Sequence, residues 1–87
     1  STMMTVVTPF SDKIADVLIE YLDRGCTLLE CRGAYSKKAS GVTLCVVDRK
    51  QMYKAKKLIY QIDPKAFLIV SEAREVYGEG FLASDQE

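Results

Sequence analysis

The sequence predicts an α+β domain of the ferredoxin-like βαββαβ type, in which two helices cover one face of a four-stranded antiparallel sheet. The main observation is the order of elements, because β-rich apolar stretches and amphipathic helical stretches alternate as β-α-β-β-α-β. The second is a polar, glycine-ended segment between the two middle strands, which is typical of a hairpin. The 87 residues leave room for one domain with one core.

A strand and a helix are predicted in the first part of the chain. Met3–Thr8 is rich in β-branched residues and stops at Pro9, as a strand does. Ser11 is the expected N-cap of the helix that follows. Gly25 is its expected stop, because glycine readily adopts the left-handed conformation at a helix end. One helical stripe should be buried, made of Ile14, Val17, Leu18, Tyr21 and Leu22.

The middle of the chain is expected to form a hairpin. We predict a strand over Thr27–Tyr35, a tip over Ser36–Gly41 and a returning strand over Val42–Val47. Leu29 and Cys31 should share one face of the first strand, because side chains alternate along a strand. The returning strand is apolar without alternation, so both of its faces should be buried.

A second helix and a last strand complete the predicted fold. Asp48 should cap the helix in a capping box with Gln51, and Asp63-Pro64 should end it. Its inward stripe is Met52, Ala55, Leu58, Ile59 and Ile62. The last strand, Ala66–Val70, is continuously apolar. The core is expected over residues 3–81 of a single domain, with residues 82–87 frayed.

Two apolar strands leave more apolar surface than two helices can cover. Exposed apolar surface of this kind usually marks an interface. We therefore expect a homo-oligomer, packed through the bare sheet face or extended by strand pairing at an edge of the sheet. Self-association also stabilises a small domain.

Charge and cysteine content narrow the classes of partner. Twelve basic and twelve acidic side chains cancel, which argues against nucleic acid or an acidic membrane as a partner. Cys26, Cys31 and Cys45 include no CxxC pair, so we expect buried, reduced thiols in a cytosolic protein and no zinc site. Cys31 and Cys45 could pair across the hairpin if the strand register places them opposite each other.

The sequence does not favour an enzyme. It contains no histidine, which removes the commonest general base and metal ligand, and we expect neither a metal nor a cofactor. An alternative is a small hydrolase that uses carboxylates, but we interpret these as solvated surface charges: Glu72, Glu75 and Glu79. Three lysines on one stripe of the second helix are interpreted as a solvated face: Lys50, Lys54 and Lys57.

Two stretches carry the candidate ligand site. The hairpin segment 33–38 combines a glycine, an aromatic ring, a hydroxyl and two ammonium groups, a set that could hold an anion. In the tail segment 78–81, two glycines flank a charge and precede an aromatic side chain, which favours close approach to another surface. The candidate ligand-binding residues are Gly33, Tyr35, Ser36, Lys37, Lys38, Gly78, Glu79, Gly80 and Phe81. A plain hairpin and a plain turn remain the alternatives.

Ordered motifs along most of the chain carry a family resemblance. They are Asp23 to Glu30, Gly33 to Ser36, Leu44 to Val47, Ile62 to Phe67 and Gly78 to Phe81. This set resembles the C-terminal cytosolic domain, of unknown function, of YitT-type bacterial membrane proteins. The resemblance implies a ferredoxin-like fold similar to regulatory ligand-binding domains of the PII and ACT types. It departs at Cys31, where the family often has glycine, so close approach of a ligand to that backbone position is less certain.

The resemblance also implies a biological context. The chain would be a module on the cytoplasmic side of the cell membrane, attached to membrane-spanning segments. Ser1 is not a start methionine and the chain's apolar runs are too short to span a bilayer, so we expect a processed chain or part of a longer protein. The leading hypothesis is a regulatory or assembly domain that senses a small anionic ligand at a subunit interface. The alternative is a purely structural oligomerisation module without a ligand.

Overall fold

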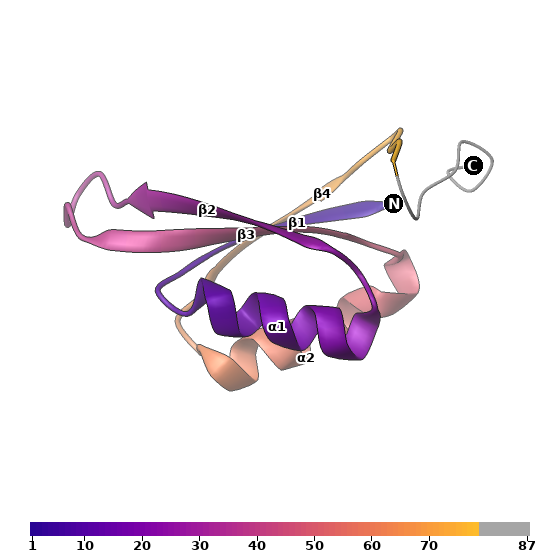
Figure 1. Cartoon of the computed structure of the whole chain (residues 1–87), viewed down its shortest axis with the longest axis horizontal. Coiled ribbons are helices and arrows are strands. Elements are labelled where there is room, and N and C mark those ends of the chain that lie inside the picture. Colours follow the sequence, from indigo (N-terminus) through magenta and orange to yellow (C-terminus); the bar gives the residue numbers. More distant parts are fainter. Residues whose placement is uncertain (79–87) are drawn as a thin grey trace.

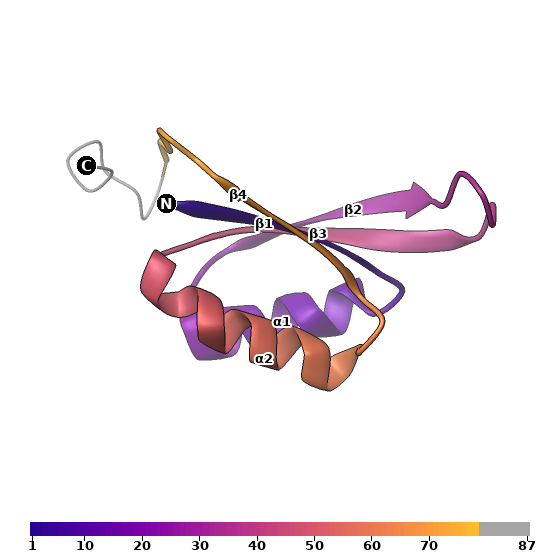
Figure 2. The same cartoon turned by 180° about the vertical axis from the view of Figure 1, so that it is seen from behind.

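A computed structural model of the chain describes residues 1–78. The elements, in order, are β1 (Thr2–Thr8), α1 (Ser11–Leu22), β2 (Cys26–Arg32), β3 (Ala39–Val47), a 3₁₀ turn (Arg49–Gln51), α2 (Met52–Ile62) and β4 (Phe67–Glu72). The strands form one antiparallel sheet in the order β2-β3-β1-β4. Both helices lie side by side against one face of it (Figures 1 and 2). The predicted ferredoxin-like βαββαβ fold is confirmed.

The core lies between the helices and the two central strands. Every second side chain of β1 and β3 points to the helices and is buried, as alternation requires. The buried apolar cluster consists of Met4, Val6, Ile14, Leu18, Leu22, Cys45, Val47, Ala55, Ile59 and Ala66. The predicted inward stripe of α2 is confirmed, with Ala55 and Ile59 fully buried and its other members packed against the cluster.

Helix α1 differs from its prediction at its start. Its N-cap is Phe10, which makes no side-chain capping hydrogen bond, so the predicted cap at Ser11 is wrong. The Thr8 hydroxyl instead accepts a hydrogen bond from the Phe10 N–H, 3.1 Å away. Ser11 lies against β3, where a Cβ built on Gly41 would be 2.9 Å from the Ser11 Cβ. Gly41 therefore serves close helix–sheet packing.

The end of α1 also differs from its prediction. The left-handed residue is Asp23, with φ 55° and ψ 42°, and its N–H donates to the Ile19 carbonyl at 3.1 Å. Aspartate tolerates this conformation, so the helix stops two residues before the predicted stop at Gly25. Tyr21 was predicted to be buried but is 54% exposed, because it lies at the rim of the helix layer.

The ends of the two helices are joined by a polar network. The predicted capping box is confirmed, and the Gln51 side-chain oxygen accepts the Asp48 N–H at 2.9 Å. The Gln51 side-chain amide donates to the Leu22 carbonyl at 2.9 Å, and the Arg24 guanidinium pairs with the Asp48 carboxylate at 2.9 Å. This network holds the start of α2 against the end of α1.

The hairpin is shifted relative to its prediction. β2 ends at Arg32, the turn spans residues 33–38 and β3 begins at Ala39, three residues before the predicted start. The Gly33 N–H donates to the Lys38 carbonyl at 3.1 Å, which closes the turn there. Gly41, predicted in the tip, pairs with Thr8 and lies inside the sheet.

The face of the sheet away from the helices is apolar. Leu29, Val42, Val7 and Phe67 are successive cross-strand partners, so one apolar row crosses all four strands. Leu29 is 49% exposed and Phe67 63%. Val42, Leu44 and Val46 of β3 lie on this face and are half-buried, so the predicted burial of both faces of β3 holds fully only on the side of the helices. We call this surface the open face.

Two of the three cysteines face each other. Cys26 lies directly opposite Cys45, whereas Cys31 lies opposite Ser40, so the register excludes the Cys31–Cys45 pair. All three are free thiols. The hydrogen bond between the Cys26 and Cys45 thiols raises the pKa of Cys26, with burial and the charge of Cys45 acting in the same direction. The same hydrogen bond lowers the pKa of Cys45 against the effect of burial, and the Arg24 guanidinium helps.

A buried hydrogen bond joins the end of β1 to the end of α2. The Thr8 hydroxyl donates to the Asp63 carboxylate at 2.6 Å, and the Lys65 N–H donates to its other oxygen at 3.0 Å. Asp63 is only 7% exposed. A buried carboxylate needs such donors, so this contact fixes α2 and the start of β4 on the sheet.

We expect Thr8→Val to lower the free energy of unfolding by about 1–3 kcal/mol, because it leaves the buried Asp63 carboxylate without one donor. Thr5→Val is the matched control, since Thr5 lies on the same strand with its side chain on the open face, and should change stability by about 0.5 kcal/mol or less. Urea unfolding measures both. Equal midpoints for the two variants would contradict the role of this contact.

Mild oxidation with diamide should form a disulfide between Cys26 and Cys45, since directly opposed strand positions have Cα separations that fit a disulfide. Each thiol gives up one hydrogen to the diazene as the sulfurs bond. Peptide mass spectrometry should find this bond in Cys31→Ser and not in Cys26→Ser. An intramolecular Cys31–Cys45 bond would show that the register is wrong.

Candidate functional site

The hairpin turn is held by its own hydrogen bonds. The Lys37 N–H donates to the Gly33 carbonyl at 2.8 Å, and Lys37 has a positive φ of 61°. The Lys38 N–H donates to the Ser36 hydroxyl oxygen at 3.2 Å. A Cβ on Gly33 would lie 2.8 Å from that same oxygen, so a larger residue there would displace the Ser36 hydroxyl from this contact. Tyr35 is fully exposed at the tip.

These contacts decide which groups of the turn could bind a ligand. The amides of Gly33, Lys37 and Lys38 already donate within the turn. The tyrosine ring and the two lysine side chains remain exposed to solvent. The turn can therefore offer charge and a stacking surface more readily than a cradle of backbone amides.

A hollow of about 400 Å³ adjoins the turn at the end of the sheet. It brings together three residues of the predicted segment with three that the sequence argument did not include: Gly33, Ser36 and Lys38 with Val7, Cys31 and Arg32. Arg32 adds a second cation beside Lys38. The position of Arg32 immediately before the turn was a signal available in the sequence. Val7 and Cys31 reach the hollow through the pairing of the strands, which only the register reveals.

The chain leaves the sheet toward the second predicted segment at the end opposite the hairpin turn (Figure 1). β4 ends at Glu72 beside the N-terminus, where the Ala73 N–H donates to the Ser1 carbonyl at 2.8 Å. Gly78 follows with a φ of 140°, a conformation that favours glycine. Glu79, Gly80 and Phe81 lie outside the described residues. The hairpin and Gly78 are thus separated along the long axis of the molecule, and one chain does not bring them together (Figure 1).

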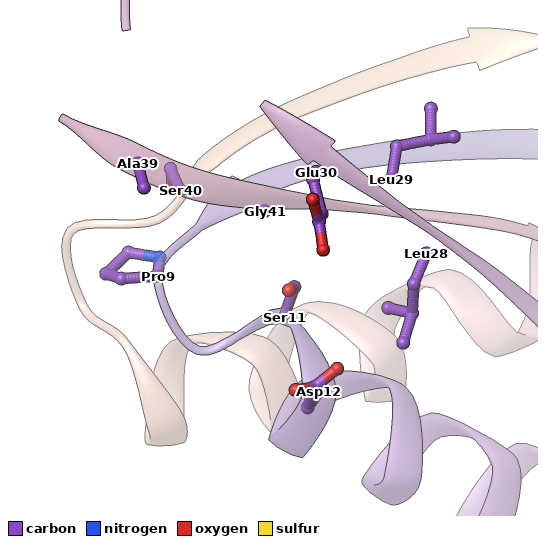
Figure 3. A pocket seen from close by; sticks show the side chains of 9 residues that line it. All are labelled: Pro9, Ser11, Asp12, Leu28, Leu29, Glu30, Ala39, Ser40 and Gly41. Carbon is purple, nitrogen blue, oxygen red and sulfur yellow. The ribbon is translucent and has the colours of Figure 1, made fainter. Parts of the chain in front are cut away.

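A further hollow, of about 450 Å³, lies between β2 and the start of α1. Figure 3 shows the Glu30 side chain pointing from the sheet toward Ser11 and Asp12 of the helix, with Leu28 beside them. It exists because the two helices leave the helix-facing side of the edge strand β2 uncovered. Within residues 1–78, no three potential ligand side chains are grouped so that they could hold a metal ion.

The carboxylates proposed for a hydrolase are not arranged as that alternative required. Glu72 lies in β4 and Glu75 in an irregular segment, so the two are not one helical turn apart. Both are exposed, and the Glu75 carboxylate accepts a hydrogen bond from the Tyr77 hydroxyl at 2.9 Å. Both carboxylates thus lie at the surface of the described chain, and they do not form a pair on one helical face.

Several relatives of this chain are named as membrane proteins. It is 38% identical over 81 residues to the "Uncharacterized protein in cccA 5'region" of Bacillus sp. strain PS3, covering 93% of this chain and 54% of that protein. It is 35% identical to the "UPF0750 membrane protein YpjC" of Bacillus subtilis strain 168, covering 95% of this chain and 29% of that protein. The corresponding identity to YitT is 26%, over 84% of this chain and 26% of that protein.

Two solved structures are similar. One is titled "Crystal Structure of Uncharacterized Protein Conserved in Bacteria DUF2179 from Eubacterium ventriosum", with TM-score 0.64 and 33% identity over 82% of this chain and 99% of that chain. The other, of a "functionally unknown protein" from Pediococcus pentosaceus, has TM-score 0.71 at 9% identity over 88% of this chain and 94% of that chain, and it supports the fold alone.

The family assignment combines these findings. This chain spans about half the length of the first relative and under a third of the Bacillus subtilis proteins. None of the helices in residues 1–78 has the length and apolar character needed to cross a membrane. Residues 24–78 match the family described as "Uncharacterized protein conserved in bacteria (DUF2179)". The chain therefore belongs to the DUF2179 family, as the DUF2179 domain of a YitT-type protein, and the resemblance found in the sequence is confirmed.

Proposed function

We propose that this chain is a regulatory and assembly domain of a bacterial membrane protein, and that it associates with a second copy through the open face. The observation that carries the proposal is the apolar row Leu29–Val42–Val7–Phe67, which no other part of the described chain covers. The relatives, which are named membrane proteins, support attachment to a membrane-spanning part. We assign the domain to the cytoplasmic side.

The energetics favour contact between copies. Leu29, Phe67 and Ile69 each expose about half of their surface on the open face. Full burial of such a side chain contributes about 1.5–3 kcal/mol, so covering the exposed half contributes roughly 1 kcal/mol for each residue of each copy. The apolar row of one copy can face the same row of a second copy, as a two-fold interface requires.

A two-fold arrangement of the open faces also completes the candidate ligand site. If the strands of the two copies run antiparallel, the hairpin turn of one copy lies near the end of β4 of the other, because the turn and the end of β4 are at opposite ends of the sheet (Figure 1). Tyr35 would then stack on a ligand ring while Lys37 and Lys38 supply charge and Ser36 donates its hydroxyl hydrogen. The partner copy would contribute Gly78, Glu79, Gly80 and Phe81. The assembled domain would thereby sense a small anionic ligand.

A purely structural oligomerisation module is the second candidate function. One observation favours it: the turn uses three of its amides and the Ser36 oxygen for internal hydrogen bonds. A turn built in this way is stable without a ligand. The two candidates agree on the open face and differ only in the role of the hairpin.

We expect Leu29→Asp to convert the assembled chain to a monomer in sedimentation velocity, because it places a charge in the apolar row. Leu28→Asp is the matched control. Leu28 is the preceding residue, is 46% exposed against 49% for Leu29, and points to the opposite face. The control should stay assembled. A wild-type chain that is monomeric at tens of micromolar, or identical behaviour of the two variants, would refute assembly through the open face.

Ligand sensing is tested on the hairpin with adenosine triphosphate, which carries a ring and phosphates, and with inorganic phosphate. Titration should shift the amide resonances of residues 34–38, and Tyr35→Ala with Lys37→Gln and Lys38→Gln should abolish the shifts. The control Tyr21→Ala with Lys13→Gln and Lys65→Gln makes the same chemical changes elsewhere and should retain them. An absence of shifts in the assembled wild-type chain, with either probe, would favour the structural module.

A further inference from the structure

The two helices carry opposite charges although the chain as a whole is neutral. The exposed acidic side chains of α1 and its C-cap are Asp12, Asp16, Glu20 and Asp23, beside one exposed cation, Lys13. The exposed cations of the 3₁₀ turn and α2 are Arg49, Lys50, Lys54, Lys56 and Lys57, and residues 49–62 contain no acidic side chain. The net charge of zero therefore includes a basic helix that lies beside an acidic one.

The cations of α2 are available to a partner. The ion pair found within residues 1–78 joins Arg24 to Asp48 and involves none of these five side chains. Two of the lysines lie over aromatic rings, with the Lys54 ammonium 5.8 Å from the ring centre of Tyr21 and the Lys57 ammonium 5.6 Å from that of Tyr53. Such contacts leave the other side of each ammonium free to meet an anion.

This charge distribution opposes the stability of the isolated helix. Lys50 and Lys54, four residues apart, and Lys54 and Lys57, three apart, are like-charged neighbours on one face. Arg49 and Lys50 also lie near the positive end of the helix dipole. Each effect costs a few tenths of a kcal/mol. Acidic side chains placed between these lysines would remove that cost. The fold itself therefore gives no reason for the basic face of α2.

We propose that the exposed face of α2 docks on an anionic lipid surface. Lysine and arginine near such a surface each attract the domain, and the ring of Tyr53 on the same face suits the headgroup region, where rings with a polar tip are favoured. Tyr53 is 74% exposed. The Tyr60 hydroxyl instead donates to the Ala66 carbonyl at 3.3 Å. The apolar stripe of α2 is buried in the core, so the contact is electrostatic and superficial, without insertion of the helix.

A lipid surface fits better than the acidic helix of another copy. The relatives are named membrane proteins, so a module attached to one stays close to a bilayer and weak contacts become effective. The proposal depends on the proposed function for this attachment alone. The acidic α1 lies beside α2 in the same layer and is repelled by the lipid, which tilts the domain so that α2 leads. The open face, on the other side of the sheet, remains available to a second copy.

The test is sedimentation of the 87-residue chain with vesicles. We expect binding to vesicles of phosphatidylcholine with about one third phosphatidylglycerol, no binding to phosphatidylcholine alone, and loss of binding as salt is raised. Lys50→Gln, Lys54→Gln and Lys57→Gln together should lower the partition coefficient about a hundredfold, since each cation near the surface is worth roughly fivefold.

A matched variant separates position from net charge. Lys13→Gln, Lys65→Gln and Arg74→Gln together remove the same three charges from exposed sites outside α2, and the variant should keep at least a tenth of wild-type binding. Equal losses in the two variants would overturn the proposal, as would the absence of binding to anionic vesicles. A salt-sensitive dimer without lipid that the α2 variant abolishes would assign the face to the acidic helix of another copy and also overturn it.

The outcome is distinguishable from failure of the proposed function. Leu29→Asp tests the open face and leaves α2 unchanged, whereas the lysine variant leaves the apolar row unchanged. Contact through the open face is apolar and persists in high salt, whereas docking through α2 is lost there. A monomeric chain that binds anionic vesicles would refute only assembly through the open face. An assembled chain that does not bind them would refute only docking through α2.

Discussion

The structure depends on one constraint: two helices cover only one face of a four-stranded sheet. β1 and β3 must bury Met4, Val6, Cys45 and Val47 toward the helices, and alternation then sends every other side chain of these strands to the opposite face. Most of those side chains are also apolar. Within residues 1–78 no further element covers them, so an interaction between copies is the simplest way to remove the apolar row from water.

Polar contacts at the element ends fix the geometry that this constraint leaves open. The Arg24, Asp48 and Gln51 network ties the helix ends together at one end of the layer, and the Thr8–Asp63 hydrogen bond anchors the far end of α2 to β1. Helices held at both ends act as a rigid layer. Charges on that layer therefore have defined directions, and a basic α2 beside an acidic α1 can orient the whole domain relative to a charged surface.

The hairpin illustrates why a plausible set of residues does not make a site by itself. Segment 33–38 contains groups that suit an anion, yet its amides close the turn and its tyrosine projects into solvent. The tail segment that was expected to join it begins at the other end of the sheet. In the proposed site the two segments come from two chains, so ligand binding would depend on assembly.

The sequence alone determined the order of elements, the buried stripe of α2, its capping box, the apolar character of both faces of β3 and the family. These depend on local periodicity and on hydrogen bonds between near neighbours, such as Asp48 and Gln51. The tertiary structure decided what depends on contacts distant in the chain. Asp23 ends α1 in place of Gly25, Gly41 lies under Ser11, Cys26 rather than Cys31 faces Cys45, and Thr8 meets Asp63 across 55 positions. Register and helix placement create these contacts, because the apolar face of each element can be buried only in one alignment with the others.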